Sequence, residues 1–203
     1  MKQFSKFSTA KIQTGSIFDP LPKGAYVLTI MRAEEEPNKN GSGSHIKVAF
    51  DIAEGEYAGF YKKQLDAQTG EDKHWPYDGI YNLPVPDDNS PQWMIDKFGT
   101  FVAALEDSND GYHWDWDEKK WTGKVIGGLF RIEQSQAGNG TVYDHTRLMW
   151  VRKADDVRNK RYGRLPNDKP IAGGGSASAG GDGNATINDF VNVASAGPDE
   201  IPF

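Results

Sequence analysis

The chain has 203 residues, 12% of them aromatic and none of them cysteine, which fits one domain of about 170 residues followed by a tail. The lack of cysteine excludes disulfides, thiolate catalysis and cysteine zinc sites, and it suits a reducing cytoplasm. No apolar run approaches the roughly 20 residues of a membrane span, and residues 1–7 do not read as a signal peptide.

The net charge of −6 is distributed unevenly along the chain. Residues 1–118 hold 11 Lys and Arg against 20 Asp and Glu, residues 119–169 hold 12 against 5, and residues 170–203 hold none against 4. A basic block between two acidic regions indicates an anionic partner for that block. The alternative is that these basic residues only decorate a solvated strand and loop.

The first half of the chain predicts an irregular arm over residues 1–22 and then three strands. Residues 24–32, 45–52 and 59–65 are rich in β-branched and aromatic side chains. In the second of these, apolar residues alternate with polar ones from Ile46 to Ile52, which directs Lys47 outward. An irregular aromatic stretch follows over residues 74–81.

The second half predicts one helix and two more strands. Ser90 is the expected N-cap, Pro91 the first helical residue, and the helix ends near Asn109. Its core face repeats at helical spacing and comprises Met94, Phe98, Phe101, Val102 and Leu105. Residues 114–121 alternate like a short hairpin, 124–132 and 141–152 are the last strands, and 153–171 form a basic extension without an obvious core face.

Together these elements predict a mainly β fold for residues 1–171. Five strands with one helix between the third and the fourth have the connectivity of a five-stranded OB-fold barrel, which often holds oligonucleotides. Residues Gly127 and Gly128 fit a bend in a barrel strand. An unrelated β-sandwich of the same elements stays open.

The last 32 residues, 172–203, predict a flexible Gly/Ser linker that ends in an acidic, apolar tip. The tip comprises Asp199, Glu200, Ile201, Pro202 and Phe203. It resembles the acidic C-terminus of bacterial single-stranded DNA-binding proteins, where an OB-fold holds the DNA. That resemblance implies that the tip recruits replication, repair and recombination proteins. A terminus that ends in Phe by chance is the alternative.

A second resemblance lies in the body of the chain. Residues 20–26, 123–127, 146–148 and 154–159 look, in this order, like a family of phage and prophage proteins of replication and recombination modules. That family is regarded as single-stranded DNA-binding, which implies that this chain binds DNA in the cytoplasm of a bacterial host cell.

Binding of unpaired strands needs cations along the phosphates and flat rings for the bases. The expected cations are Lys47, Lys62, Lys63, Arg131, Arg147, Arg152, Lys153, Arg158, Lys160, Arg161 and Arg164. The expected stacking residues are Trp75, Tyr77, Trp114, Trp116 and Tyr143. A tryptophan taken alone is more often a core residue than a stacking platform, and the charged neighbours of Trp114 and Trp116 are the feature that favours stacking for these two.

No catalytic residue, metal or cofactor is expected. The pairs around His113 and His145 do not match a metal-ligand spacing, and the chain lacks both a Gly-x-Ser-x-Gly elbow and a phosphate loop. The remaining alternative is a non-catalytic adaptor that binds protein or duplex DNA.

Overall fold

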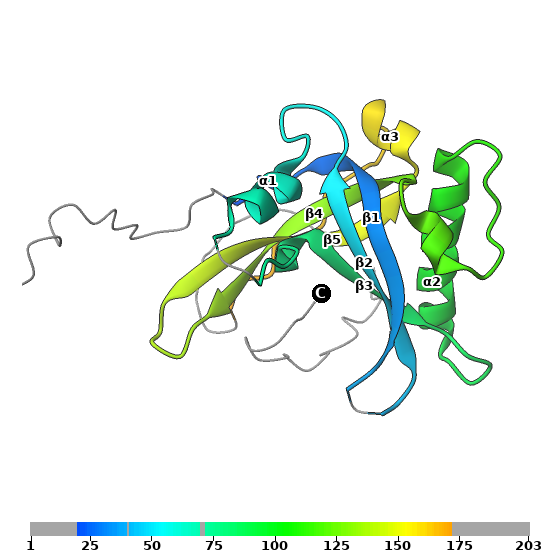
Figure 1. Ribbon diagram of the computed structural model, residues 1–203, viewed down its shortest axis with the longest axis horizontal. Coiled ribbons are helices and arrows are strands. Elements are labelled where there is room, and N and C mark those ends of the chain that lie inside the picture. The colour runs from blue at the N-terminus through cyan, green and yellow to red at the C-terminus, as the bar shows by residue number, and fades with distance from the viewer. Residues whose placement is uncertain (1–19, 40, 70–71, 172–203) are drawn as a thin grey trace, which may run out of the picture.

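The computed structural model describes residues 20–39, 41–69 and 72–171, and the structural statements below refer to them (Figure 1). It contains one five-stranded sheet in which all neighbours are antiparallel, in the order β3-β2-β1-β4-β5. The elements in chain order are β1 (Ala25–Pro37), β2 (Ser44–Ile52), α1 (Phe60–Ala67), the 3-10 turn η2 (Tyr77–Gly79), β3 (Ile80–Val85), α2 (Gln92–Ser108), the 3-10 turn η3 (Glu118–Trp121), β4 (Val125–Gln136), β5 (Val142–Arg152) and α3 (Ala154–Arg158). The predicted mainly β class is confirmed.

Four strands lie where the sequence predicts them, but the third does not. Residues 60–67 form helix α1 rather than a strand, and the third strand is β3, which begins at the end of the stretch expected to be irregular and continues to Val85. The buried Asp51 carboxylate explains the helix, because it accepts the backbone N–H of Tyr61 at 2.9 Å and of Lys62 at 3.1 Å. These are N–H groups of the first turn, which have no partner inside the helix.

Helix α2 lies between the third and the fourth strand, which confirms the prediction of a helix at this place in the chain. It buries Phe98, Phe101 and Leu105, while Ser90 is not its N-cap. Instead, the Ser90 hydroxyl accepts the Asp87 N–H at 2.8 Å, so it stabilises the turn before the helix. The hairpin predicted for residues 114–121 is also wrong, since this segment contains only η3.

The main core gathers side chains from all five strands, α1, α2 and η3. The largest fully buried residues are Trp121, Tyr61, Phe50, Phe101 and Phe130. Strand β2 is buried on both faces from Ile46 onward, so the expected alternation between a buried and a solvent face is not observed.

The extension after β5 has a core face, contrary to expectation. Helix α3 buries Ala154 and Val157 in a second cluster with Val27 and Leu129. Farther along, the Lys169 N–H donates to the Ile132 carbonyl at 2.8 Å, which ties the end of the described chain to β4.

The two outer strands of the sheet, β3 and β5, share no ladder, but one of them is contacted by the turn that precedes the other. Side chains of η2, immediately before β3, reach β5, and we call this contact the seam. In the described residues the sheet is therefore not closed into a barrel by backbone pairing. Figure 1 shows the β1–β2 and β4–β5 hairpins projecting from the body in different directions.

The predicted tail, residues 172–203, and residues 1–19 of the predicted arm lie outside the described residues. None of the helices among the described residues combines the length and the hydropathy that crossing a bilayer requires.

Candidate nucleic-acid interface

One face of the β4–β5 hairpin brings together three of the predicted residues. Arg131 lies directly opposite Arg147, Glu133 opposite His145, and Ser135 opposite Tyr143. Cross-strand partners point to the same side of a sheet, and so do residues two apart along a strand. These six residues therefore share one face, which we call the hairpin face. Tyr143 is half exposed on it, at 50%.

Tyr77 of η2 meets this face at Arg147. The Arg147 guanidinium carbon lies 3.8 Å from the centroid of the Tyr77 ring, and its Nη1 donates to the Tyr77 carbonyl at 3.2 Å. The same Nη1 lies 3.1 Å from Oδ1 of Asp78. Tyr77 keeps 50% of its surface exposed, so a guanidinium and a tyrosine ring form a stacked pair that remains accessible.

His145 is the second link across the seam. Its Nδ1 lies 3.4 Å from Oδ2 of Asp78, and its Nε2 lies 2.8 Å from the Ser135 hydroxyl. The order Ser–His–Asp is that of a hydrolase triad, but Ser135 stands exposed on a regular strand rather than at a strained elbow. We therefore read the chain of contacts as one that fixes His145 and Asp78 across the seam.

Behind the seam, η2 packs against residues of the core. A Cβ placed on Gly79 would lie 2.6 Å from Trp75 Nε1 and 2.9 Å from the Tyr61 ring, so η2 packs closely on both. Burial, with a smaller contribution from the Asp78 carboxylate, raises the pKa of the Tyr61 hydroxyl above its ordinary range. The tyrosine accordingly stays neutral behind the charged residues.

The cations of the hairpin face already have carboxylate partners. Arg131 donates through Nε to Glu133 at 2.8 Å, and Arg147 pairs with Asp78. A bound phosphate would have to share or displace these partners, which lowers the net gain of each contact.

Lys62 and Lys63 lie on α1 rather than on a strand. Lys62 pairs with Asp66, and Lys63 donates to the Ala58 carbonyl at 3.0 Å. Both are exposed on α1, whose Tyr61 packs against η2.

The remaining predicted cations form a separate group around α3 and the end of β5. Arg158 pairs with both Glu54 and Asp155. The hydrogen bonds to Glu54, and to a smaller extent the one to Asp155, raise the pKa of its guanidinium above the ordinary arginine value. Arg161 pairs with Asp156 at 3.4 Å, whereas Lys153, Lys160 and Arg164 have no ion-pair partner among the described residues.

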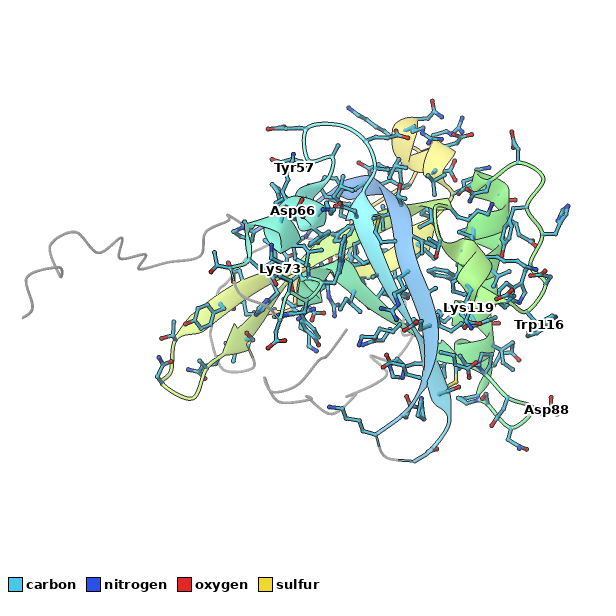
Figure 2. The ribbon with its side chains drawn as sticks, in the orientation of Figure 1. Tyr57, Asp66, Lys73, Asp88, Trp116 and Lys119 are labelled. Atoms are coloured by element: carbon cyan, nitrogen blue, oxygen red, sulfur yellow. The ribbon has the colours of Figure 1, made fainter. Side chains whose placement is uncertain are left out.

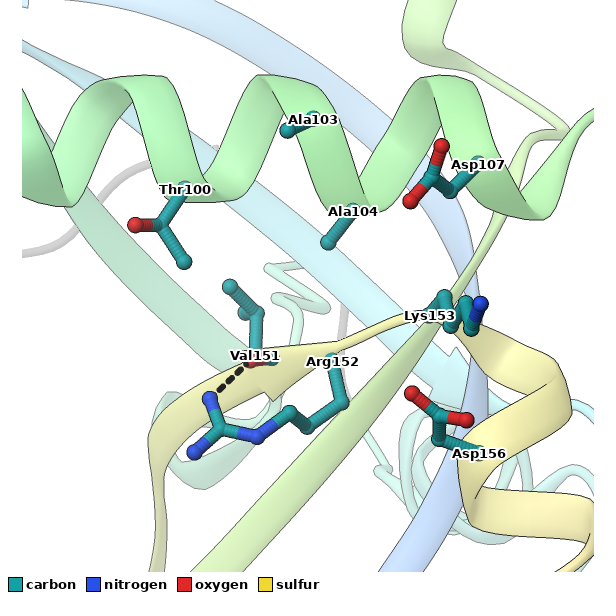
Figure 3. Close-up of a pocket in the computed structure, with 8 residues that line it drawn as sticks. All are labelled: Thr100, Ala103, Ala104, Asp107, Val151, Arg152, Lys153 and Asp156. Atoms are coloured by element: carbon teal, nitrogen blue, oxygen red, sulfur yellow. Dashed lines mark hydrogen bonds between the residues drawn. The ribbon is translucent and has the colours of Figure 1, made fainter. Parts of the chain in front are cut away.

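Arg152 and Lys153 also line a shallow groove of about 350 Å³ between α2 and the end of β5 with the start of α3 (Figure 3). Its lining comprises Thr100, Ala103, Ala104, Asp107, Val151, Arg152, Lys153 and Asp156. Two carboxylates offset the two cations, and Arg152 turns back to donate to the Val151 carbonyl at 2.8 Å. The groove therefore has no dominant charge to select a ligand.

The three predicted tryptophans differ in exposure. Trp75 packs against the core and donates through Nε1 to the Gly79 carbonyl at 3.1 Å. Trp114 is wedged between Phe98 and Trp121, with ring centroids 6.2 and 5.0 Å away. Trp116 is 81% exposed and lies far from the hairpin face.

Lys47 is not part of any of these groups. It is 6% exposed, and its Nζ lies 3.6 Å from the Glu36 carboxylate on the neighbouring strand.

Asp78, His145 and Ser135 belong to the candidate site but were not among the predicted residues. The alternation Tyr143-x-His145-x-Arg147 could have placed His145 beside two predicted residues. No comparable signal marks Asp78, whose role depends on the contact between η2 and β5.

The described residues contain no group of three or more His, Asp or Glu side chains arranged to hold a metal ion. No family model matches the chain, and no curated protein matches it.

Proposed function

We propose that this protein binds single-stranded DNA without sequence preference, through the hairpin face and Tyr77. The observation that carries the proposal is the stacked Tyr77–Arg147 pair on the same face as Tyr143, because it puts cations and accessible rings on one surface. Proteins of this class combine a positively charged track for the backbone with aromatic side chains for the bases.

Each of these residues has a role in the proposal. Tyr77 and Tyr143 stack on bases, and stacking is worth about 1–3 kcal/mol per base. Arg131 and Arg147 contact phosphates, and Lys62 and Lys63 extend the track along α1. Lys153, Lys160 and Arg164 form a second basic region, which a longer strand would reach.

We further propose that the sheet is a partly open OB-fold barrel. The strand order β3-β2-β1-β4-β5 supports this, since pairing of the two outer strands would close the sheet, and η2 already bridges them. In OB-folds the loop between strands 4 and 5 is one of those that bind oligonucleotides. The hairpin face lies at that loop.

The tail has its own part in the proposal, which rests on the sequence alone. The tip from Asp199 to Phe203 recruits replication, repair or recombination proteins in the cytoplasm of a bacterial host, as part of a phage or prophage module. Its two carboxylates and its terminal Phe suit a pocket with a basic rim.

The test is a titration of fluorescein-labelled oligo(dT) by anisotropy at two salt concentrations. We expect log Kobs to fall with log[salt] at a slope of about −0.7 per phosphate contacted. Tyr77→Ala and Tyr143→Ala should each weaken binding about tenfold, within the range of one lost stacking contact. Trp93→Ala is the matched control, because Trp93 is a similarly exposed ring on α2, at 42%.

Arg147→Gln would be a poor first variant, since Arg147 also holds Asp78 across the seam. Absence of oligo(dT) binding in dilute buffer would refute the proposal. Duplex of equal length that outcompetes poly(dT) would favour the adaptor that binds duplex DNA. A chain ending at Pro198 should keep or gain DNA affinity and lose capture of the recruited enzyme.

A further inference from the structure

Trp116 is a large apolar side chain that the proposed DNA surface does not use. At 81% it is the most exposed of the large hydrophobic residues in the described part of the chain. Figure 2 shows it at the opposite edge of the molecule from Asp66 and Lys73, which lie by α1 and the seam. A strand bound at the hairpin face would not reach it without crossing the body of the protein.

The side chain is held in place rather than loosely displayed. Its ring leans on Trp114 with centroids 5.9 Å apart at an interplanar angle of 50°, and Trp114 in turn packs on Phe98 and Trp121. The backbone N–H of Trp114 donates to the Glu106 carboxylate at 2.7 Å, which anchors the segment to the end of α2. Trp116 therefore stands on a rigid aromatic base.

The backbone at this position is unusual. Trp116 has φ = +66°, a left-handed conformation that is an outlier for a bulky residue. Such a conformation persists only where the surroundings impose it, and it is found preferentially at functional positions. Here it turns a tryptophan toward solvent next to Trp114.

The charge around Trp116 indicates the chemistry of its partner. Residues 106–120, which we call the acidic segment, carry six carboxylates against two lysines. Lys120 pairs with Asp115 and lies 3.8 Å from Asp117, while Asp110 and Glu118 have no ion-pair partner among the described residues. A phosphate backbone would be repelled here, whereas a cation would be attracted both by the carboxylates and by the indole face.

We propose that Trp116 and the acidic segment form a docking site for a partner protein that presents a basic, arginine- or lysine-bearing segment. The indole is the anchor that the cationic side chain covers, and the surrounding carboxylates fix its register. Tryptophan is one of the residue types enriched among those that dominate binding energy at protein interfaces, and an exposed apolar surface with a polar rim marks such interfaces. This site is independent of DNA binding at the hairpin face.

The probe is a fluorescein-labelled octapeptide of alternating Arg and Gly, with the Glu–Gly octapeptide as its charge-reversed counterpart. We expect the full chain to bind the first and not the second by anisotropy. Trp116→Ala should weaken binding at least about fivefold, as expected for loss of a cation–π anchor. Trp93→Ala should leave it unchanged, which separates the site from the general attraction of an acidic protein.

Three outcomes would overturn the proposal. The first is equal peptide affinity in wild type, Trp116→Ala and Trp93→Ala. The second is an oligo(dT) affinity that falls more than about twofold in Trp116→Ala, which would make Trp116 a base platform. The third is a wild-type oligomer, detected by sedimentation, that is absent in Trp116→Ala. The occupant of the site would then be a second copy of this chain. Thermal unfolding of both variants verifies that each is folded.

Discussion

At the scale of single residues, Gly127 shows how closely the second cluster is packed. A Cβ added there would lie 2.7 Å from Val157 Cγ2 and 2.9 Å from the carbonyl oxygens of Arg152 and Lys153. Because two of these three neighbours are backbone atoms, they cannot move aside as a flexible side chain would. The glycine is therefore needed for the close approach of α3 to β4. This packing explains the residue better than the bend in a barrel strand that the sequence suggests.

Gly127→Ala should therefore destabilise the protein by about 1–3 kcal/mol, the range observed for overpacked cores. Gly99→Ala is the control. Gly99 lies in α2 with nothing within 4 Å of its added Cβ, so alanine there should stabilise by about 0.5–1 kcal/mol. Urea unfolding of the two variants measures both changes, and equal stabilities would contradict the packing argument.

At the scale of elements, α3 ends in a motif that usually contains glycine. The Arg161 N–H donates to the Asp156 carbonyl at 2.7 Å and the Lys160 N–H to the Val157 carbonyl at 3.1 Å, which is the Schellman pattern. Lys160 occupies its left-handed position, with φ = +54°. A lysine there costs about 1–2 kcal/mol relative to a residue without Cβ.

Lys160→Gly should accordingly stabilise the protein by about 0.5–1 kcal/mol, after allowing for the greater entropy of glycine in the unfolded chain. Arg164→Gly removes a cation from the same extension without a left-handed φ, so no gain in stability is expected. If both cations contact phosphates, each variant should also reduce the salt slope by about 0.7. Urea unfolding and the oligo(dT) titration separate the two effects, and a loss of stability in Lys160→Gly would refute the strain argument.

The elements also show what the sequence could and could not predict. The β-branched and aromatic residues of β1, β2, β4 and β5, and the helical spacing of the apolar residues of α2, made these elements predictable. The helix α1 was not, because eight residues have little propensity of their own and the capping carboxylate of Asp51 lies outside the segment. Likewise Tyr143 and Arg147 share a face by period two, whereas Tyr77 and Asp78 join them only through the tertiary fold.

At the scale of the whole molecule, three buried or half-buried tyrosines make the stability sensitive to alkaline pH. Burial, with smaller contributions from Tyr57 and Glu56, raises the pKa of Tyr26 to about 12. Burial also raises the pKa of Tyr61 and of Tyr81 above the ordinary value. In the unfolded chain each titrates near its ordinary pKa of about 10.

The unfolded state therefore releases these protons first as the pH rises, while the folded state retains them. Stability should be complete below about pH 10 and decline from there toward pH 12 and beyond. Tyr26→Phe should make this decline with pH less steep, because the variant lacks one of the three hydroxyl groups. At neutral pH the variant should be less stable than wild type, because it lacks the hydrogen bond from Tyr26 to the Pro22 carbonyl at 2.7 Å. Urea unfolding between pH 8 and 11.5, with tyrosinate absorbance at 295 nm, measures both. Parallel pH profiles for the variant and wild type would contradict the assignment.

The seam between η2 and β5 couples anion binding at Arg147 to the contact between the two edges of the sheet. Arg147 is held by Asp78 and Tyr77, and no backbone ladder among the described residues joins β3 to β5. An anion that takes the guanidinium thus weakens the tie between the two edges of the sheet. By reciprocity, anything that loosens this tie frees the guanidinium for an anion, by the same factor in affinity. Binding of a DNA strand and separation of the two edges of the sheet would then form one coupled equilibrium.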